Sequence, residues 1–454
     1  MRITHSDARI PSLRASSLMV TASVTSILLL TLMCGVVCVA SSLDYTQQVN
    51  QTGGHRSQPD KKIIISVPLE STPYGYKQRI FIGSSEKEFT VMVTLRHSML
   101  WIPSINCTES CRGRAKFDPS NSSSFLRDGR SWTLDNYDGG AQGVLGIDSV
   151  KMHGKSPYEP YEDGQLFAPN STFGMASSTT GREGLEGVDG MLGLASLADK
   201  GTASAPFFRQ LYENDAIFLQ RLLIHLKQYP QASSDAGSIV YGTSSDNINC
   251  EDAAFSFNDW TKGSYQFRAS LAMGSFETTV YYLIMPELIP FIIGSPAVIA
   301  EIAGIAGAKY ANGSYVVDCD ASIPDLEIRE AARPLIIFIK SDNLITKKED
   351  VCVLTVNFHL SIGFGPDMYL GAPLFKEYCI GFDFGYNMFH ISHAKRATTV
   401  SSTHSPTTTK TRITTLTTSP ATTTHRLFTT TSADSSTEKL RLSFFFIVFF
   451  IGGR

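Results

Sequence analysis

The stretch around residue 94 constrains the fold of this chain more than any other. Phe89, Val91 and Val93 alternate along it, so their side chains lie on one face of an extended strand. A short loop over residues 95–99 then leads into a second apolar run, residues 100–103. Two short apolar strands joined by so short a loop predict a β-rich core.

The same pattern occupies most of the chain. Short alternating runs over residues 63–67, 78–82 and 89–93 are separated by Pro, Gly and Ser, which is typical of an all-β protein. Residues 207–227 are an exception, because their apolar side chains have the spacing of short helices. A second β-rich half opens near Trp260.

Length, charge and cysteine content narrow the class of protein. The 454 residues suffice for one large core or two moderate ones, and the net charge of −3 argues against nucleic acid as a partner. Cys34 and Cys38 lie in an apolar N-terminal run, and the other cysteines form an even set without a CxxC motif or neighbouring histidines. Such a set indicates disulfides, so we expect no metal and no cofactor.

The N-terminal region has the features of a secretory signal. Arg9 and Arg14 precede an apolar stretch that ends near residue 40, and polar Ser41 follows. We therefore expect residues 1–40 to be a signal peptide, with an uncleaved N-terminal anchor as the alternative. Five Asn-x-Ser/Thr sequons point to the same compartment: Asn50, Asn106, Asn121, Asn170 and Asn312. The chain is thus expected to be secreted or held at the cell surface.

The segment around residue 94 resembles the first active-site segment of pepsin-like aspartic proteases. In that family an Asp-Thr-Gly-Ser-Ser loop stands just before Leu-Trp-Val-Pro, and here Leu-Trp-Ile-Pro occupies residues 100–103. Thr94 takes the place of the catalytic Asp, Leu95 and Arg96 replace Thr-Gly, and His97 begins the replacement of Ser-Ser. The resemblance implies that the scaffold is present and that this carboxylate is absent.

Further segments resemble the same family in the same order. They are residues 117–125, a flap-like hairpin at 137–148, residues 173–176, residues 188–195, a strand at 237–242 and a closing segment at 369–383. The resemblance covers about residues 63–392 and implies an all-β, bilobal pepsin-like fold with a cleft between two β-rich lobes. It divides this region into an N-terminal lobe at 62–245 and a C-terminal lobe at 246–396. Asp189 would be structural, as the equivalent residue is in the family.

The resemblance also requires a second active-site loop. That loop should follow the apolar strand at 280–284 and precede Gly294 and Pro296. Counting back from Gly294 puts Pro286 at the Asp position, whereas counting back from Pro296 puts Glu287 there. Both registers stay open, and neither contains Asp-Thr-Gly or Asp-Ser-Gly.

The family pattern further implies how the cysteines pair. We expect disulfides between Cys107 and Cys111, between Cys319 and Cys352, and between Cys250 and Cys379. The last would be an extra bridge of the kind seen in nematode members.

The chemistry of the family then decides what the replaced residues mean. An aspartic protease needs two carboxylates about 3 Å apart that share one proton. Thr94 cannot act as a base at acid pH, and a lone Glu287 has no partner with which to share a proton. We interpret His97 as structural, and we recognise no Ser-His-Asp, Cys-His or zinc motif in the sequence that would replace the pair.

We therefore expect a catalytically inactive, monomeric protein that binds an extended peptide or protein in the cleft. Tyr137, Gly139 and Gly140 of the flap-like hairpin and Arg96 beside the lost carboxylate would contact this ligand. Two alternatives stay open. One is a divergent but active acid endopeptidase that works through Glu287, and the other is a structural surface glycoprotein whose cleft is filled.

The two ends differ from the family. Residues 41–61 are polar and rich in Gly, Ser and Gln, and we expect them to be disordered. Residues 397–438 are rich in Thr and Ser, which is typical of an O-glycosylated stalk. Residues 439–454 contain an apolar run too short to span a bilayer, so they indicate either a GPI signal or free secretion. We expect membrane contact only through such a lipid anchor or through an uncleaved N-terminal segment.

Overall fold

The computed structural model describes the part of the chain that carries the motifs above. The described residues are 64–134, 140–158, 160–180, 187–228, 232–243, 250–251, 255–258, 265–348, 350–359, 365–386 and 388–395. All of them belong to one compact unit, residues 1–397. The expected signal peptide, the segment 41–61, the stalk and the C-terminal tail lie outside the described residues.

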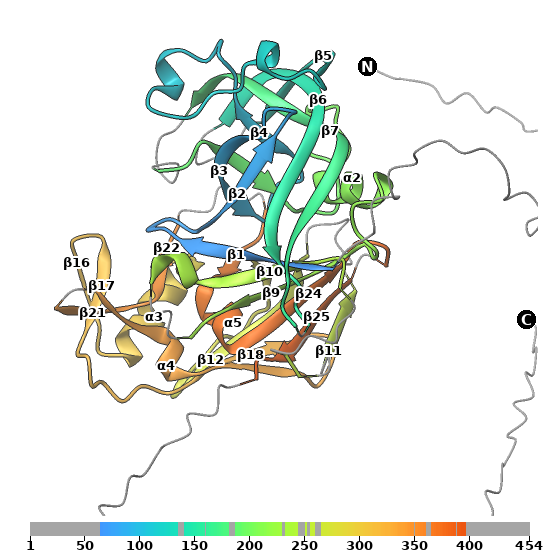
Figure 1. The fold of residues 1–454 in the computed structure, drawn as a ribbon. Coiled ribbons are helices and arrows are strands. Elements are labelled where there is room, and N and C mark those ends of the chain that lie inside the picture. Colours follow the sequence, from blue (N-terminus) through green and yellow to red (C-terminus); the bar gives the residue numbers. More distant parts are fainter. Residues whose placement is uncertain are drawn as a thin grey trace, which may run out of the picture. The chain divides into compact units, whose positions relative to one another are not determined.

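The described strands form three sheets, and the largest contains strands from both ends of this unit. In order across the sheet they are β11 (Phe255–Asn258), β25 (Met388–His393), β24 (Tyr378–Asp383), β9 (Arg221–Leu226), β10 (Gly237–Tyr241), β1 (Ile65–Ser71), β2 (Tyr76–Ile82), β3 (Lys87–Thr94), β8 (Gly190–Gly193), β4 (Leu100–Pro103), β7 (Asp163–Thr180), β6 (Gly140–Lys155) and β5 (Leu126–Leu134). Strands β24 and β25 therefore return from the end of the chain to lie beside β9 and β10, as Figure 1 shows.

The two other sheets come from the second half of the chain. One runs in the order β19 (Ile336–Ile339), β18 (Leu326–Glu330), β12 (Phe267–Met273), β14 (Tyr282–Pro286), β23 (Met368–Leu370), β15 (Ile292–Gly294) and β22 (Val356–Phe358), and β13 (Phe276–Glu277) pairs with β12. The other consists of β16 (Lys309–Ala311), β17 (Ser314–Val317), β21 (Val351–Leu354) and β20 (Ile345–Lys348). The expected all-β fold class is confirmed.

Helices are few and short among the described residues. They are α2 (Phe207–Glu213), α3 (Pro296–Ile305), α4 (Ser341–Leu344), α5 (Ala372–Glu377) and the 3-10 turns η1 (Glu109–Cys111), η2 (Pro119–Asn121) and η3 (Ser233–Asp235). No helix in this part of the chain is both long and apolar enough to cross a membrane.

The expectation of helices over residues 207–227 is wrong in its second half. Helix α2 ends at Glu213, and residues 221–226 form strand β9. Strand β9 lies between β10 and β24, so it is an interior strand of its sheet, and most of its side chains are buried. An interior strand carries a nearly continuous apolar run, which periodicity alone does not distinguish from a buried helix.

One arrangement of four strands occurs twice, once in each half of the chain. Strand β3 pairs in parallel with β8, β8 pairs antiparallel with β4, and β4 pairs in parallel with β7. In the same way β14 pairs in parallel with β23, β23 pairs antiparallel with β15, and β15 pairs in parallel with β22. The two loops that leave β3 and β14 therefore occupy equivalent places.

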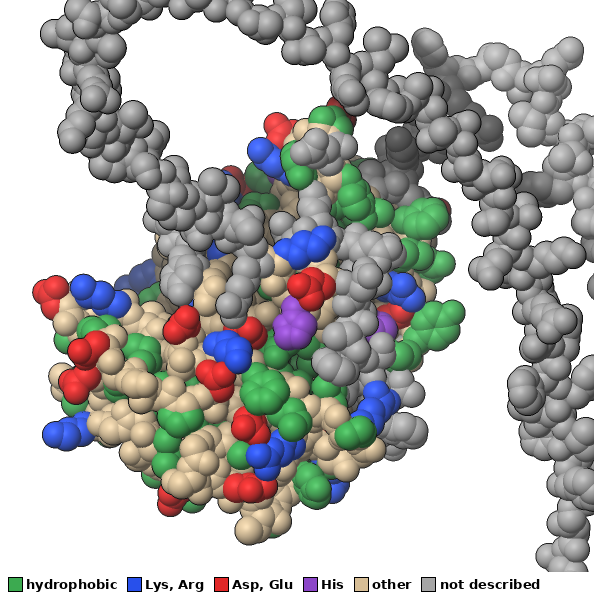
Figure 2. Space-filling model, turned by 90° about the horizontal axis from the view of Figure 1, so that it is seen from below, with side chains coloured by type: hydrophobic (Ala, Val, Ile, Leu, Met, Phe, Trp, Pro, Cys, Tyr) green, Lys and Arg blue, Asp and Glu red, His purple; other side chains and the backbone are tan. Residues whose placement is uncertain are grey.

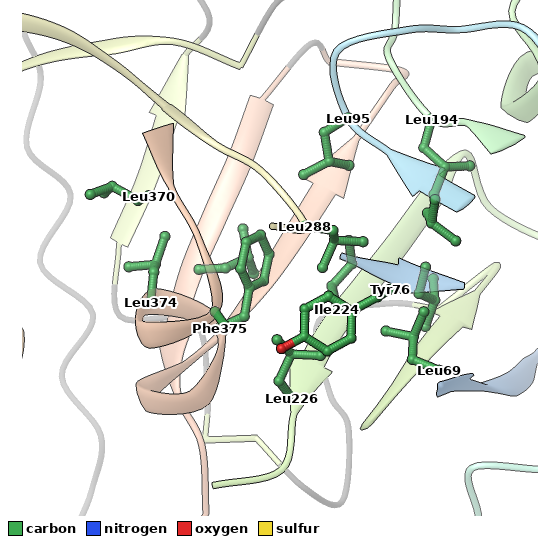
Figure 3. Close-up of a cluster of buried hydrophobic side chains, with 14 of the residues drawn as sticks. Leu69, Tyr76, Leu95, Leu194, Ile224, Leu226, Leu288, Leu370, Leu374 and Phe375 are labelled. Carbon is green, nitrogen blue, oxygen red and sulfur yellow. The ribbon is translucent and has the colours of Figure 1, made fainter. Parts of the chain in front are cut away.

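We call residues 95–99 the first central loop and residues 288–291 the second central loop. Each begins with a leucine, Leu95 or Leu288, whose side chain is buried. Figure 3 shows both leucines in one apolar cluster with Tyr76 and Ile224, which come from β2 and β9. Burial of these side chains in a shared core fixes both loops to the same part of the protein.

The disulfides agree with the pairing that the resemblance implied. The structure contains bonds between Cys107 and Cys111, Cys250 and Cys379, and Cys319 and Cys352. The second of these bonds joins residues 129 positions apart. It fastens β24 to the segment that begins the second half of the chain.

Candidate functional site

Thr94 and Glu287 meet where the two halves of the duplicated arrangement come together. Thr94 is the last residue of β3, and Glu287 directly follows β14. The Oγ1 atom of Thr94 donates a hydrogen bond of 3.1 Å to Oε2 of Glu287. Glu287 is only 1% exposed, so its carboxylate is almost completely shielded from bulk water.

The strand register makes Thr94 and Glu287 equivalent positions. Thr94 is paired with Gly193, the last residue of β8. Pro286 is the last paired residue of β14, so Glu287 is the next one and stands opposite Gly371. Gly193 and Gly371 each follow a leucine of the parallel partner strand, and that leucine pairs with the residue before Thr94 or before Glu287. Of the two registers left open by the sequence, the geometry therefore selects Glu287 and not Pro286 as the counterpart of Thr94.

The second central loop is one residue shorter than the first. Residues 95–99 separate Thr94 from β4, whereas residues 288–291 separate Glu287 from β15. The ambiguity between the two registers has a different source. Ser295 separates the markers Gly294 and Pro296, so counting back from each of them gives positions that differ by one residue.

The carboxylate of Glu287 is surrounded by donors from both central loops. Its Oε1 accepts hydrogen bonds from the backbone N–H of Leu95, at 3.1 Å, and of Leu288, at 2.8 Å. Its Oε2 accepts from Thr94 Oγ1 and also lies 3.2 Å from the N atom of Leu95. The Nε atom of Arg96 is 3.5 Å from Oε2, which makes an ion pair. Each carboxylate oxygen thus has at least two donors.

Arg96 is held between a carboxylate and an aromatic ring. Its guanidinium carbon lies 5.6 Å from the centre of the Tyr369 ring, within the range of a cation–π contact. Tyr369 belongs to β23, which is the strand beside β14. The Arg96 side chain remains 31% exposed, so the cation is anchored and still reaches solvent.

Two glycines let the central loops pass close to the neighbouring strands. A Cβ atom on Gly193 would lie 2.5 Å from the carbonyl oxygen of His97 and 2.6 Å from the N atom of Met99. A Cβ atom on Gly371 would lie 2.4 Å from the carbonyl oxygen of Ile289. Both positions therefore require a residue without a side chain.

A second carboxylate, that of Asp199, holds the far end of the first central loop. Its Oδ2 accepts hydrogen bonds from the N–H of Ser98, at 2.8 Å, and from the hydroxyl of Ser98, at 2.9 Å. The Nδ1 atom of His97 lies 3.1 Å from Oδ1. Burial by itself would raise the pKa of Asp199, but these partners outweigh it and hold the pKa below its usual range. His97 therefore has a partner in the protein, as expected for a structural histidine.

Similarity to known proteins agrees with this architecture. Residues 75–394 match the family described as eukaryotic aspartyl protease. The chain belongs to this family. Aspartic protease 6 of Caenorhabditis elegans is 30% identical over 335 residues, which are 71% of this chain and 83% of that protein. Aspartic protease 2 of Necator americanus is 23% identical over 379 residues, which cover 83% of that protein. Cathepsin E-B of Xenopus laevis is 25% identical over 254 residues, which cover 60% of that protein.

Of the three residues of the flap-like hairpin that were expected to bind a ligand, the structure describes one. Tyr137 and Gly139 lie outside the described residues. Gly140 begins strand β6, and its N–H donates a hydrogen bond of 2.9 Å to Oγ1 of Thr180 on β7.

Asp189 accepts backbone hydrogen bonds from Thr90 and Ala115 through its two carboxylate oxygens. This geometry fits the structural role expected for Asp189.

The expected glycosylation sites can be placed for four of the five sequons. Asn50 lies outside the described residues. The other four asparagines are exposed to solvent: Asn106, Asn121, Asn170 and Asn312. Exposure is what an attached glycan requires, and glycosylation itself stays a prediction.

Two residues of the site were missed by sequence reasoning. Asp199 and Tyr369 lie far from the first central loop in the sequence, and no motif connected them with Arg96 or His97. A lone Asp or Tyr carries no such signal before the fold brings it to its partner.

Among the described residues, no group of three or more His, Cys, Asp or Glu side chains is arranged to hold a metal ion.

Replacing Gly193 by Ala should destabilise the protein by about 1–3 kcal/mol, because the new Cβ atom meets backbone atoms that cannot move aside without distorting the first central loop. Gly304 in α3 provides the control, since a Cβ atom there meets nothing within 4 Å. Gly304→Ala should instead stabilise the helix by about 0.5–1 kcal/mol. Urea unfolding of both variants measures the difference, and equal effects would contradict the close-approach argument.

Replacing Asp199 by Asn should cost about 1–3 kcal/mol at neutral pH, because the charged acceptor for Ser98 and His97 is lost. A carboxylate whose pKa is lowered by folding stabilises the protein above its unfolded pKa of about 4 and loses this contribution as the pH falls through its folded pKa. The difference between the two proteins should therefore shrink below about pH 4. Asp163→Asn, at an exposed ion pair with Lys155, is the control and should change stability little at any pH. A difference for Asp199→Asn that does not change with pH would refute this account.

Proposed function

We propose that this member of the aspartyl protease family is not proteolytic and binds an extended peptide or protein segment instead. The single observation that carries the proposal is the environment of Glu287. Its carboxylate stands opposite Thr94, and it is buried and surrounded by hydrogen-bond donors. By resemblance to pepsin-like enzymes, Thr94 stands where the first catalytic carboxylate would be, and we propose Glu287 rather than Pro286 as the position of the second.

The chemistry of the family requires both carboxylates. One of them activates a water molecule and the other polarises the carbonyl of the substrate while they share a proton. Thr94 offers a hydroxyl in place of the first carboxylate, and its hydroxyl hydrogen is directed to Glu287. A hydroxyl does not titrate in the acid range, so no shared proton is available from this side.

Glu287 alone is a poor substitute for the pair. To activate water, a carboxylate oxygen must accept a hydrogen bond from that water. Oε1 already accepts from Leu95 and Leu288, and Oε2 accepts from Thr94 and faces Arg96. These contacts argue against the alternative of an acid endopeptidase that works through Glu287.

Peptide binding does not depend on the missing chemistry. An extended chain binds through backbone hydrogen bonds and through pockets for alternate side chains, neither of which needs a catalytic pair. The family architecture that would hold such a chain is kept, including the glycines at 193 and 371. Arg96 adds an anchored cation next to Tyr369, and we propose that it favours acidic side chains or a terminal carboxylate in the ligand.

Nucleic acid is not the proposed partner. Acidic and basic side chains are interspersed on the face of the molecule that Figure 2 shows, and the net charge of the chain is −3. Nucleic-acid binding typically uses a strongly basic patch or stripe. We propose that the protein acts as a monomer.

Two assays on the purified, secreted protein test this function. Incubation with denatured haemoglobin or casein at pH 3–5 should produce no cleavage beyond that of a Glu287→Gln control, and pepstatin should not bind. Cleavage that pepstatin inhibits and that Glu287→Gln abolishes would establish the endopeptidase alternative.

In the second assay, a library of extended peptides is screened against the same protein. It should return binders whose preference for acidic residues changes in the Arg96→Gly variant. Absence of any binder would favour the remaining alternative, a structural surface glycoprotein.

We also propose that the protein is secreted or displayed at the cell surface. Disulfide-bonded members of this family are typically proteins of the secretory pathway, and the three disulfides fit an oxidising compartment. An antibody should therefore label intact, unpermeabilised cells or detect the protein in the medium. A phospholipase specific for phosphatidylinositol should release the cell-bound fraction if the C-terminal tail is a GPI signal. Labelling that appears only after permeabilisation would contradict this location.

A further inference from the structure

The sheet that contains β15 and β23 has one buried face and one half-exposed face. Along each of these two strands the outer residues are buried and the middle residue is only half-buried. The middle residues are Ile293 and Tyr369, and they are paired with each other. Because successive side chains of a strand point to opposite faces, Ile293 and Tyr369 lie on the face that the core does not fill.

Strand β22 and the residue after it extend this face. Asn357 of β22 is paired with Ile293. His359 comes two positions later, and its ring centre lies 6.0 Å from that of Tyr369. We call these four half-buried residues the open face: Ile293, Asn357, His359 and Tyr369.

The polar side chains of Asn357 and His359 offer hydrogen-bond donors on the open face. Oδ1 of Asn357 accepts the N–H of Phe358 at 2.9 Å. Only an oxygen can accept there, so the NH₂ group of Asn357 is left as a donor. The Nε2 atom of His359 is buried and has no hydrogen-bond partner in the described part of the chain. A buried polar atom without a partner is costly, which indicates that a ligand atom completes this site.

Cations lie beside the same strands. The guanidinium carbon of Arg96 is 5.6 Å from the centre of the Tyr369 ring, and this side chain is 31% exposed. Arg96 and His359 therefore approach one aromatic ring. Lys348 adds an exposed ammonium group whose Nζ lies 5.2 Å from the ring centre of Phe291, the residue just before β15.

Two carboxylates near these strands already accept backbone hydrogen bonds. That of Glu287 accepts from both central loops. That of Asp367, which directly precedes β23, accepts the N–H of Leu283 at 2.7 Å. The open face thus presents donors and a cation to a ligand, which makes it complementary to an anion.

We propose that the open face is a carboxylate-binding site. The ligand's carboxylate accepts hydrogen bonds from His359 and Arg96 beside the ring of Tyr369, and the NH₂ group of Asn357 is a further donor. This inference deepens the proposed function and rests on it, because the carboxylate belongs to the bound peptide. It is either an acidic side chain or the C-terminus of that peptide, and His359 becomes a residue that determines specificity.

Nuclear magnetic resonance of the full secreted chain at pH 7 and constant ionic strength tests the site, with acetate as the probe. The imidazole Cε1–H signal of His359, assigned by its absence in a variant, should shift with acetate and reach a plateau. Acetamide has nearly the same shape without the charge and should cause no such shift. Equal responses to acetate and acetamide would overturn the proposal.

Substitution of His359 separates hydrogen bonding from packing. His359→Phe keeps a ring beside Tyr369 and removes both nitrogens, so acetate should bind about tenfold more weakly or worse, as followed by the amide signal of Tyr369. His359→Gln supplies an NH₂ donor and should stay within about threefold of the wild type. His153→Phe is the matched control and should change nothing, because His153 is an exposed histidine whose ring centre lies 4.7 Å from that of Phe81.

An unchanged acetate affinity in His359→Phe would refute the role of His359. The comparison of acetate with acetamide needs only the unaltered chain, with the signal assigned through His359→Gln. It therefore still decides the matter if His359→Phe does not fold.

Three peptides distinguish the two sources of the carboxylate. They are N-acetylated hexa-alanine with a free C-terminus, its C-terminal amide, and the same amide with one alanine replaced by glutamate. Displacement of acetate by the first or the third peptide identifies the source, and equal displacement by the uncharged amide would overturn the proposal. If acetate binds and no peptide displaces it, the carboxylate site stands and the proposed function fails.

Discussion

The arrangement of the two central loops depends on a hydrogen-bond acceptor for two buried backbone N–H groups. The N–H groups of Leu95 and Leu288 lie in a region where the leucine side chains provide no oxygen, and the carboxylate of Glu287 accepts from both. A buried charge is costly unless it is paired and hydrogen-bonded. Here three donor groups and the guanidinium of Arg96 meet that condition. The proposed function rests on the same contacts, because they occupy the oxygens that would have to accept a hydrogen bond from a water molecule.

Close packing of the loops makes this arrangement possible. Gly193 and Gly371 allow the central loops to touch the ends of β8 and β23, and the buried side chains of Leu95 and Leu288 anchor the loops in one core (Figure 3). Asp199 holds the first loop from its other end through Ser98 and His97. The first loop is thus fixed at both ends by carboxylates, one of which belongs to the other half of the chain.

The proposed function separates the scaffold of an aspartyl protease from its chemistry. The duplicated strands, the close-approach glycines and the disulfides serve to position two loops, whatever side chains those loops carry. In the proposed function, Thr94 and Glu287 stand in place of the carboxylate pair, so the positioning remains and the shared proton does not. Recognition of an extended chain relies on the scaffold, which is why we propose binding without cleavage.

The sequence by itself determined the fold class and the first central loop, because alternating strands and the motifs near Thr94 are local features. The cysteine pairing was implied by the family resemblance and not by the spacing of the cysteines. It failed for residues 221–226, since an interior strand and a buried helix carry the same apolar run. It also left Pro286 and Glu287 unresolved. Only the pairing of β14 with β23 selected Glu287, because Ser295 separates the markers Gly294 and Pro296 and their counts disagree until the strands are in register. The contacts of Glu287 with Leu95, and of Asp199 with His97, were decided by tertiary structure alone, because they join residues about 100 to 190 positions apart that no sequence spacing relates.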